Sequence, residues 1–422
     1  MRAETSIADA VNASPRLRAI ADVIAARPEG APDVFVVGGT VRDILLGRER
    51  GDDIDLAVEG DAIAFANVLA DALGGHATPH RKFGTAVVSV ADGQHVDVVT
   101  TRRESYHAPG ALPTVEHAEL EHDLQRRDFT INAMAASLGR DDLGALYDPY
   151  SGRKDLADHT IRVLHDASFV DDPTRILRGV TYEARFGFRF DAHTETLARA
   201  CLASGHVGDL SSSRLRDELV DLLGDPHAVD GMRRLGELGV DAAIHPHLRG
   251  GDDAAALFSR AVTLRDELGV DVPTWRIGVA VLARGMTAKE TADWLNRIKV
   301  RRKDADRVVA AVTFAPRIVE RLRATALEPA DVVAVADPFA PDAPLMALAM
   351  DDRPELRDYF ARLRDVRLEI RGDDLIGMGL SESPRIGDIL GEIRRRKLNG
   401  ELRGREAELE AARELVEAAA HA

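Results

Sequence analysis

Two aspartates stand out in this sequence of 422 residues, because they are spaced as Asp-x-Asp within an expected strand. The run Asp53-Ile-Asp55-Leu-Ala-Val alternates polar and apolar residues, and side chains alternate between the two faces of a strand. Asp53 and Asp55 are therefore expected to share one face, while Ile54 and Leu56 face the core. Neighbouring carboxylates repel each other unless they share a hard cation such as Mg²⁺, which takes oxygen ligands. A solvated turn is the alternative interpretation.

A diglycine, Gly38-Gly39, separates an apolar run at residues 34–37 from an apolar-periodic segment at residues 41–46. The first run is typical of a buried strand and the second of a short helix. Bare backbone at the start of a helix can turn its N–H groups toward phosphate oxygens. Because this bend comes directly before the Asp-x-Asp run, the two features together predict a nucleoside triphosphate held by metal.

A third aspartate, Asp97, lies within a β-rich run at residues 95–100, which follows a similar run at residues 85–90. Asp97 is either a further carboxylate near the metal or a surface residue of an edge strand. With a helix expected at residues 61–73, these runs predict a mixed sheet with helices on one side. Residues 102–113 contain two prolines and no periodicity, so we expect a long loop there.

Two adjacent arginines precede an apolar run in Arg126-Arg127-Asp128-Phe-Thr-Ile-Asn132-Ala. The pattern predicts a helix with Asp128 as its N-cap. The arginines are then either solvated neighbours of the cap or, in the case of Arg127, ligands of triphosphate oxygens, which suit a planar guanidinium.

Asp172 and Arg175 are three residues apart, so both are expected on one face of a helix. A carboxylate accepts a hydrogen bond from an exocyclic amine, and a guanidinium donates to a ring nitrogen or a carbonyl. Cytosine and adenine offer an amine beside a ring acceptor, whereas uracil and guanine have a carbonyl in place of the amine. The pair could therefore select C and A, at roughly 1–3 kcal/mol per mismatch by analogy with base-edge readout. An ordinary surface ion pair is the alternative.

The whole chain limits the classes of protein. No run of about 18 apolar residues suggests a membrane span, and the N-terminus lacks a signal-peptide pattern. The single cysteine, Cys201, excludes an internal disulfide and a Cys-rich zinc site. We therefore expect a cytoplasmic protein without membrane contact. The net charge of −16 argues against a nucleic-acid partner on average, but basic clusters lie at residues 297–302 and 394–397.

The diglycine bend with Arg42 and Asp43, the Asp53-x-Asp55 pair, and the segment from Arg126 to Asn132 carry a resemblance. In order and spacing they resemble the head domain of the class II tRNA nucleotidyltransferase/poly(A) polymerase family. Residues 148–162 resemble that family's hinge between head and neck, residues 171–178 its nucleotide-recognition helix, residues 213–219 its closing neck motif and residues 372–387 its tail element. The resemblance covers residues 31–225 and resumes weakly near residue 370.

The resemblance implies an α+β enzyme with a nucleotidyltransferase head, a mixed sheet with flanking helices, followed by an all-helical neck, body and tail. It implies Mg²⁺ on Asp53 and Asp55, with Asp97 as a candidate third ligand, and attack of an RNA 3′-hydroxyl on the α-phosphorus with release of pyrophosphate. The nucleotide-binding residues it implies are Gly38, Gly39, Arg42, Arg127, Asn132, Asp172, Arg175 and Arg178. In the tail, it implies that Arg394, Arg395, Arg396 and Lys397 grip tRNA.

The expected domains are a helical lead-in at residues 1–30, the catalytic head at 31–150, a helical neck for nucleotide recognition at 151–225, a helical body at 226–365 and an RNA-binding helical tail at 366–422. The implied substrates are tRNA, CTP and ATP, with CMP and/or AMP added without a template to make CCA or part of it. No protein partner can be inferred. A poly(A) polymerase acting on other RNAs and a non-catalytic RNA-binding protein on the same fold are the alternatives.

Three positions depart from the family pattern. Thr181 stands where the recognition helix usually carries an arginine, and Ser213 replaces an acidic residue. Residues 108–113 lack an Arg-Arg-Pro stretch that many relatives have. Thr181 therefore does not supply the phosphate or sugar contact that the resemblance implies, and the loop does not indicate whether the enzyme switches between C and A addition.

Overall fold

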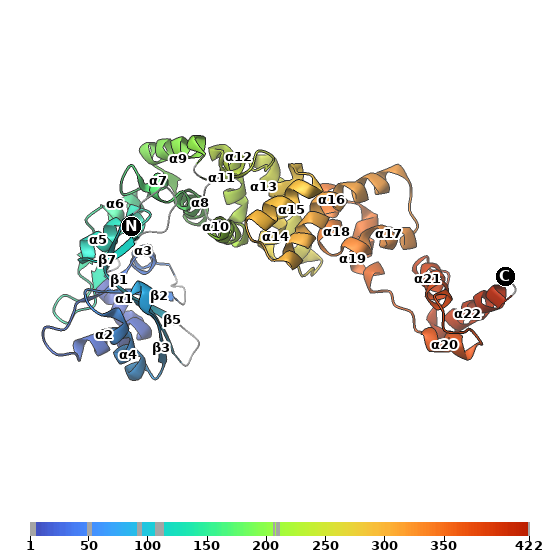
Figure 1. Ribbon diagram of the computed structural model, residues 1–422, viewed down its shortest axis with the longest axis horizontal. Helices are drawn as coiled ribbons and strands as arrows, with labels where there is room; N and C mark the ends of the chain where they lie inside the picture. The colour runs from blue at the N-terminus through green and yellow to red at the C-terminus, as the bar shows by residue number, and fades with distance from the viewer. Residues whose placement is uncertain are drawn as a thin grey trace. The chain divides into compact units, whose positions relative to one another are not determined.

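The computed structural model describes residues 6–48, 53–90, 95–105, 114–205, 207 and 212–420. The chain divides into two compact units, Met1–Glu218 and Leu219–Ala422. Among the described residues, every strand lies in the first unit and the second unit is helical (Figure 1). The finer division into five domains stays a prediction.

A seven-stranded mixed sheet lies at the centre of the first unit, with the strand order β3-β4-β5-β2-β1-β8-β9. Its strands are β1 Val34–Val37, β2 Asp53–Val58, β3 His76–His80, β4 Thr85–Ser89, β5 His95–Thr100, β8 Ala135–Ser137 and β9 Leu146–Tyr147. β2 and β5 are parallel, and the other neighbouring strands are antiparallel. The predicted mixed sheet is confirmed, and so are the four strands predicted at residues 34–37, 53–58, 85–90 and 95–100.

Helices cover both faces of this sheet. α4 (Ala62–Leu73) packs along β3, β4 and β5. α5 (Leu120–Gln125) packs through Leu120 and Leu124 on Phe35 and Ala57, whose side chains point away from α4. The prediction of helices on one side only is therefore wrong. The physical reason is that all of β1 is buried, so both of its faces need cover.

Two helices replace the single one expected at the N-terminus, α1 Ile7–Ala13 and α2 Pro15–Ala25. Ser14 separates them, because its side chain accepts a hydrogen bond from Leu17 N (3.4 Å) and the following proline has no N–H to continue α1. The segment expected as a loop begins with a strand, β6 Arg102–Ser105, which pairs with β7 Thr114–His117. The rest of that segment lies outside the described residues.

Six further α-helices are described in the first unit: α3 Gly39–Leu45, α6 Gly152–Ala157, α7 Ser168–Asp171, α8 Thr174–Phe186, α9 Ala192–Ser204 and α10 Ser212–Gly224, the last of which runs on into the second unit. α8 packs closely on an aromatic group, because Gly179 has no Cβ that would collide with Phe190. Phe129 is 0% exposed and lies edge-on to Tyr182 of α8 at 5.9 Å. A two-stranded pair, β10 Thr160–Ile161 and β11 Arg189–Phe190, flanks this group. These contacts fix α8 against the turn that follows α5.

The second unit consists of α11 Ala228–Leu238, α12 Val240–Ile244, α13 Asp252–Glu267, α14 Thr274–Leu282, α15 Ala288–Arg297, α16 Arg302–Ala324, α17 Pro329–Ala336, α18 Asp342–Met350, α19 Pro354–Ala361, α20 Gly372–Gly377, α21 Arg385–Leu398 and α22 Gly404–Ala420. The all-helical character predicted from residue 226 onward is confirmed for the described residues. Of the described helices, none alone has the length and apolar composition to cross a membrane. One bent pair, Pro329–Phe339 with Asp342–Met350, meets those two criteria when taken together.

Candidate active site

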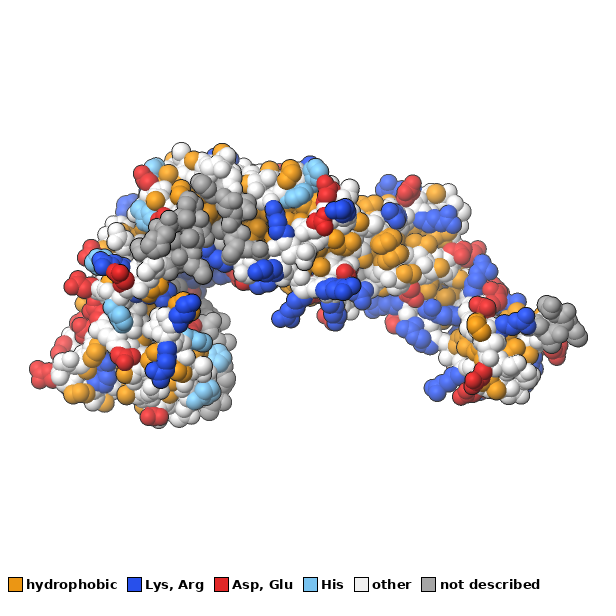
Figure 2. Space-filling view, in the orientation of Figure 1, with side chains coloured by type: hydrophobic (Ala, Val, Ile, Leu, Met, Phe, Trp, Pro, Cys, Tyr) orange, Lys and Arg blue, Asp and Glu red, His pale blue; other side chains and the backbone are white. Residues whose placement is uncertain are grey.

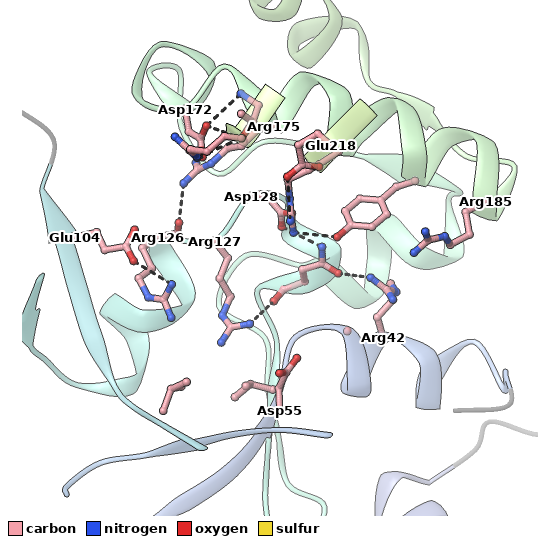
Figure 3. A pocket seen from close by; sticks show the side chains of 18 residues that line it. Arg42, Asp55, Glu104, Arg126, Arg127, Asp128, Asp172, Arg175, Arg185 and Glu218 are labelled. Atoms are coloured by element: carbon pink, nitrogen blue, oxygen red, sulfur yellow. Dashed lines mark hydrogen bonds and ion pairs between the residues drawn. The ribbon is translucent and has the colours of Figure 1, made fainter. Parts of the chain in front are cut away.

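A cavity of about 780 Å³ in the first unit is lined by the sheet, the turn after α5, and helices α8 and α10. Its lining includes five acidic residues, Asp55, Glu104, Asp128, Asp172 and Glu218. It also includes seven arginines, Arg42, Arg126, Arg127, Arg175, Arg178, Arg185 and Arg214. Figure 3 shows Asp55 extending from the sheet toward Arg127, with Asp172 and Arg175 at the opposite side. In a chain with a net charge of −16, this cavity is a local concentration of cations.

The sheet contributes carboxylates to the cavity floor. Asp55 of β2 lines the cavity, and the parallel register places Asp97 of β5 beside it and His95 beside Asp53. β5 lies inside the sheet, so the interpretation of Asp97 as an edge-strand residue is wrong. The side chain of Asp53 lies outside the described part of the chain, so its sharing of a face with Asp55 stays a prediction. Among the described residues, no three His, Cys, Asp or Glu side chains gather in a metal-binding group.

The diglycine bend lies beside this carboxylate. Gly39 lines the cavity, and Asp55 N donates to Thr40 Oγ1 (3.4 Å) in the first turn of α3 (Gly39–Leu45). Gly38 has φ +63°, and a Cβ on it would lie 2.5 Å from Arg127 Nη1. The glycine therefore provides both the backbone conformation and the space that Arg127 occupies.

The turn after α5 differs from the helix expected there. α5 ends at Gln125, Thr130–Asn132 form a single 3₁₀ turn, and β8 follows. The prediction of a helix opened by Asp128 is wrong, because this apolar run is buried in the sheet, where β8 pairs with β1. Asp128 instead accepts from Phe129 N (2.8 Å) and Asn132 Nδ2 (3.0 Å), which closes the turn.

Asp128 also joins the sheet domain to α8. Its carboxylate accepts from Arg178 Nη2 (2.7 Å) and Nε (2.9 Å), while Asn132 Oδ1 accepts from Arg42 Nη1 (2.7 Å). Burial raises the pKa of Asp128, but Arg178 and Asn132 outweigh burial and hold that pKa below its usual value. Asp128 in turn raises the pKa of Arg178. Both groups are therefore charged, and a continuous chain of hydrogen bonds runs from Arg42 to Arg178.

Asp123 orients the two adjacent arginines. It is 0% exposed and accepts from Arg126 Nη2 (2.8 Å) and Arg127 Nη2 (2.9 Å). Burial raises the pKa of Asp123, and the two guanidinium groups lower it further than burial raises it. Arg126 also contacts Glu104 (3.3 Å). The arginines are thus held in place, not solvated as the alternative interpretation expected.

Asp172 and Arg175 both line the cavity, but they do not share one helix face. Asp172 lies in extended backbone (φ −144°, ψ 91°) between α7 and α8, so that prediction is wrong. Its carboxylate accepts from Thr174 Oγ1 (2.6 Å) and from Arg214. Arg175 is 5% exposed and donates to Ser168 Oγ (2.6 Å) and the Arg126 carbonyl (2.8 Å). Each side chain therefore has its own partners, and the alternative of a surface ion pair between them is wrong.

Several cavity residues had no predicted role in binding: Glu104, Arg126, Tyr182, Arg185, Arg214 and Glu218, while Asp128 was expected only as a helix N-cap. Tyr182 and Arg185 follow Arg178 at positions i+4 and i+7, a spacing that could have revealed them. Arg214 and Glu218 lie in the segment that resembles the closing neck motif. Glu104 carried no signal, because it lies in a segment expected as a loop. Thr181 does not reach the cavity, since it is 1% exposed and donates to the Leu177 carbonyl (3.1 Å).

The basic cluster at residues 394–397 belongs to α21 in the second unit and has acidic neighbours there. Arg394 contacts Asp337 (3.1 Å), and Arg396 contacts Glu392 (3.3 Å). Lys397 contacts Glu408 and Glu369. Arg395 is exposed. RNA binding by this cluster stays a prediction.

Two family models match this chain. A model of the poly(A) polymerase head domain matches residues 34–162. A model described as the probable RNA- and SrmB-binding site of polymerase A matches residues 187–250. The first match contains the sheet and the turn after α5.

Similar proteins of known name are tRNA nucleotidyltransferases. The A-adding enzyme of Geobacter sulfurreducens is 36% identical over 400 residues, which cover 92% of this chain and 45% of that protein. The CCA-adding enzyme of Geobacillus stearothermophilus is 30% identical over 398 residues, which cover 88% of this chain and 90% of that protein. The chain spans half or less of the length of three A-adding relatives, at 45%, 50% and 22%.

Solved structures match along nearly the whole chain. A CCA-adding enzyme in an apo form aligns with a TM-score of 0.84 at 30% identity, over 99% of both chains. The Thermotoga maritima CCA-adding enzyme in complex with tRNA aligns with a TM-score of 0.81 at 29% identity, over 99% of this chain and 98% of that one. As the sequence resemblance predicts, the chain belongs to the tRNA nucleotidyltransferase/poly(A) polymerase family.

Proposed function

We propose that this protein is a metal-dependent tRNA nucleotidyltransferase. It transfers CMP and/or AMP from CTP or ATP to the 3′ end of tRNA without a template and releases pyrophosphate. The observation that carries the proposal is the cavity in which Asp55 faces a cluster of arginines. Relatives named as A-adding, CC-adding and CCA-adding enzymes, and similar structures named as complexes with tRNA, CTP and ATP, support it. We place the activity in the cytoplasm.

The metal assigned to the proposal is Mg²⁺, held by Asp53 and Asp55 with Asp97 as a candidate third ligand. The donor set fits this cation, because the register places carboxylates side by side on β2 and β5 and Mg²⁺ takes oxygen ligands. When bound, Mg²⁺ lowers the pKa of the attacking hydroxyl and neutralises charge on the leaving group.

The triphosphate is assigned to the arginines nearest the carboxylate face. Arg127 is held by Asp123 (2.9 Å) and Arg178 by Asp128 (2.7 Å). Because buried carboxylates fix these side chains, their remaining N–H groups are pre-oriented, and planar guanidinium groups bind phosphate with paired hydrogen bonds. Arg42, fixed by Asn132, and the backbone at Gly38 and Gly39 complete the proposed phosphate site.

The base is assigned to Asp172 and Arg175. Arg214 and Thr174 hold the carboxylate of Asp172 in place, and it is assigned as the acceptor for an exocyclic amine. Arg175 is buried, and it donates to two neutral acceptors, a serine hydroxyl and a carbonyl oxygen. A buried guanidinium gains most from a further acceptor, which a ring nitrogen or the carbonyl of cytosine supplies.

The decisive experiment offers purified protein four tRNAs, ending before CCA, after C, after CC and after CCA, each with single nucleotides and Mg²⁺. Sequencing of the 3′ ends gives the products. The A-adding relative is 36% identical, against 29% for a CC-adding one, so we expect AMP addition to tRNA ending in CC in particular. Long adenosine tails on unrelated RNAs would instead identify a poly(A) polymerase. RNA binding without pyrophosphate release would identify a non-catalytic protein.

A further inference from the structure

The sheet face that carries Asp55 is covered in one half and open in the other. Next to the cavity, at Phe35, Val37 and Ala57 of β1 and β2, it packs beneath α5. Over β3 and β4 the same face is accessible. Val87 pairs with Asp97, and Thr78 with Val87. Val87 is half-buried and Thr78 is exposed, whereas Ala86 and Val88, on the face toward α4, are buried.

One row of this open face leads directly out of the cavity. Val99 lines the cavity, and the register pairs Val99 with Thr85 and Thr85 with His80. Neighbouring strands are about 4.8 Å apart, so His80 lies about 10 Å from Val99. Beyond His80 the chain turns through the 3₁₀ segment Arg81–Phe83. We call His80, Arg81, Lys82, Phe83 and Thr85 the hairpin strip.

The hairpin strip has the chemistry of a single-strand binder. Phe83 is 52% exposed, and Lys82 Nζ lies 5.4 Å from its ring centroid. The segment from residue 72 to residue 91 contains no Asp or Glu, although the chain has 71 acidic residues among 422. Figure 2 shows imidazole and basic side chains over the region of β3 and β5. An exposed ring flanked by cations suits a base and its phosphates.

We propose that the hairpin strip binds the single-stranded 3′ end of the RNA, with one base stacked on Phe83 and phosphates beside Arg81 and Lys82. The two strand spacings from Val99 at the cavity to His80 in the strip span about 10 Å, which is the length of roughly three stacked nucleotides at about 3.4 Å each. A protein partner would require a larger apolar core, whereas Phe83 is the only large apolar side chain in the strip. The inference rests on the proposed function, because it assumes an RNA primer.

The test compares two RNAs. One is a tRNA that keeps its unpaired discriminator base and ends after two added cytidines, and the other ends at the last base pair of the acceptor stem. We expect Phe83→Ala to weaken binding of the first RNA roughly 5- to 150-fold, the range for loss of one stacked base, and to leave the second within twofold. Arg81→Gln with Lys82→Gln should weaken binding of the first RNA and reduce the slope of log affinity against log salt by about 1.4.

Matched controls are Val68→Ala on α4, where Val68 is 50% exposed, and Lys154→Gln on α6, whose side chain is 71% exposed. Neither should change binding of either RNA. Equal effects of Phe83→Ala on both RNAs, or no effect on either, would overturn the inference. Nucleotide transfer by the wild-type protein is measured separately and tests the proposed function. If the wild type is active but the strip variants bind both RNAs as the wild type does, the role of the hairpin strip is rejected and the proposed function is retained.

Discussion

Arginines cluster in two regions of this chain, around the cavity of the first unit and along α21 of the second, and the two clusters differ in their acidic partners. In the cavity, the partners of Arg126, Arg127 and Arg178 are Asp123 and Asp128, with side chains 0% and 7% exposed. On α21, Asp337 and Glu392 are 33% and 39% exposed. The first set of carboxylates is buried and fixed, whereas the second is partly exposed to solvent.

This difference decides what a cluster can bind. A buried carboxylate fixes one edge of a guanidinium and leaves the other edge directed at a ligand. A solvent-exposed ion pair contributes about 1 kcal/mol or less and competes with an incoming phosphate for the same N–H groups. Both regions are rich in basic residues, but buried carboxylates orient the arginines of the cavity, whereas on α21 the buried carboxylate of Glu408 pairs with Lys397. The predictions below separate the two regions, from the largest expected effect to the smallest.

The largest effect is expected where the cavity has its carboxylates. Asp55→Asn should lower the rate of nucleotide incorporation about 10³-fold or more, because loss of a metal ligand removes several kcal/mol of transition-state stabilisation. Asp53→Asn should cause a similar loss of rate if its side chain lies on the same face of β2 as Asp55. Single-turnover incorporation of labelled AMP and CMP measures both. Asp61→Asn, at the exposed N-cap of α4, is the control, and equal losses in all three variants would reject the assignment.

Removal of a buried cavity arginine comes next. Arg175→Gln should reduce kcat/KM for the preferred nucleotide about 10- to 100-fold, since one base-edge pairing carries about 1–3 kcal/mol of discrimination. The ratio of kcat/KM for the preferred nucleotide to kcat/KM for UTP or GTP should fall by a similar factor. Steady-state kinetics with the four nucleotides measures this. Arg199→Gln, in an exposed pair on α9, should leave the ratio unchanged, and a loss of activity with unchanged selectivity would contradict the role in base recognition.

The fold could be predicted largely from local pattern. The strand of Val34–Val37 is a continuous apolar run, and α4 has Asp61 and Gly74 at its ends. The apolar pattern and the capping residues were therefore sufficient to predict these two elements. The prediction of a helix after Asp128 was wrong, because the apolar segment that follows contains β8, which pairs with β1 in the sheet. A short apolar run does not distinguish a helix from a strand when the partner is distant in sequence.

The site could be predicted in part. Asp55, Gly39 and Arg178 line one cavity, and their motifs were recognisable. The groups that orient these residues were missed. Asp123 had no predicted role, although it stands three and four residues before Arg126 and Arg127, a helical spacing that could have indicated the two ion pairs. Asp172 was assigned to a helix face, yet it lies in extended backbone before α8, because Thr174 begins that helix.

A smaller effect, on stability, is expected from the link between the sheet and α8. Asp128→Asn should lower the free energy of unfolding by about 2 kcal/mol, a hydrogen bond to a charged group being worth about 1.5–3 kcal/mol. We take the lower part of that range because Arg178 is 41% exposed and solvent screens the pair. Urea denaturation at neutral pH measures the difference. Asp158→Asn, from an exposed pair with Lys154, should change stability by less than about 0.5 kcal/mol.

The pH dependence of this effect follows from the depressed pKa of Asp128. A carboxylate with a lowered folded-state pKa stabilises the protein above its unfolded pKa of about 3.9 and loses that contribution as pH falls through the folded value. The difference between wild type and Asp128→Asn should therefore be largest at neutral pH and shrink below about pH 4. A constant difference down to pH 3 would show that the charge of Asp128 is not what stabilises the contact.

The smallest effect is expected on α21. If Arg394, Arg395 and Arg396 all met phosphates, replacing the three by Gln would reduce the slope of log affinity against log salt by about 2 to 3. Arg394 and Arg396 already contact Asp337 and Glu392, and Arg395 is exposed. We therefore expect a slope change of about 1 and a loss of tRNA affinity below about fivefold. Arg395→Gln alone should reproduce the slope change and the loss of tRNA affinity of the triple variant. A triple variant with three times the slope change of Arg395→Gln would show that tRNA displaces the local carboxylates, and the contrast between the two arginine clusters would then fail.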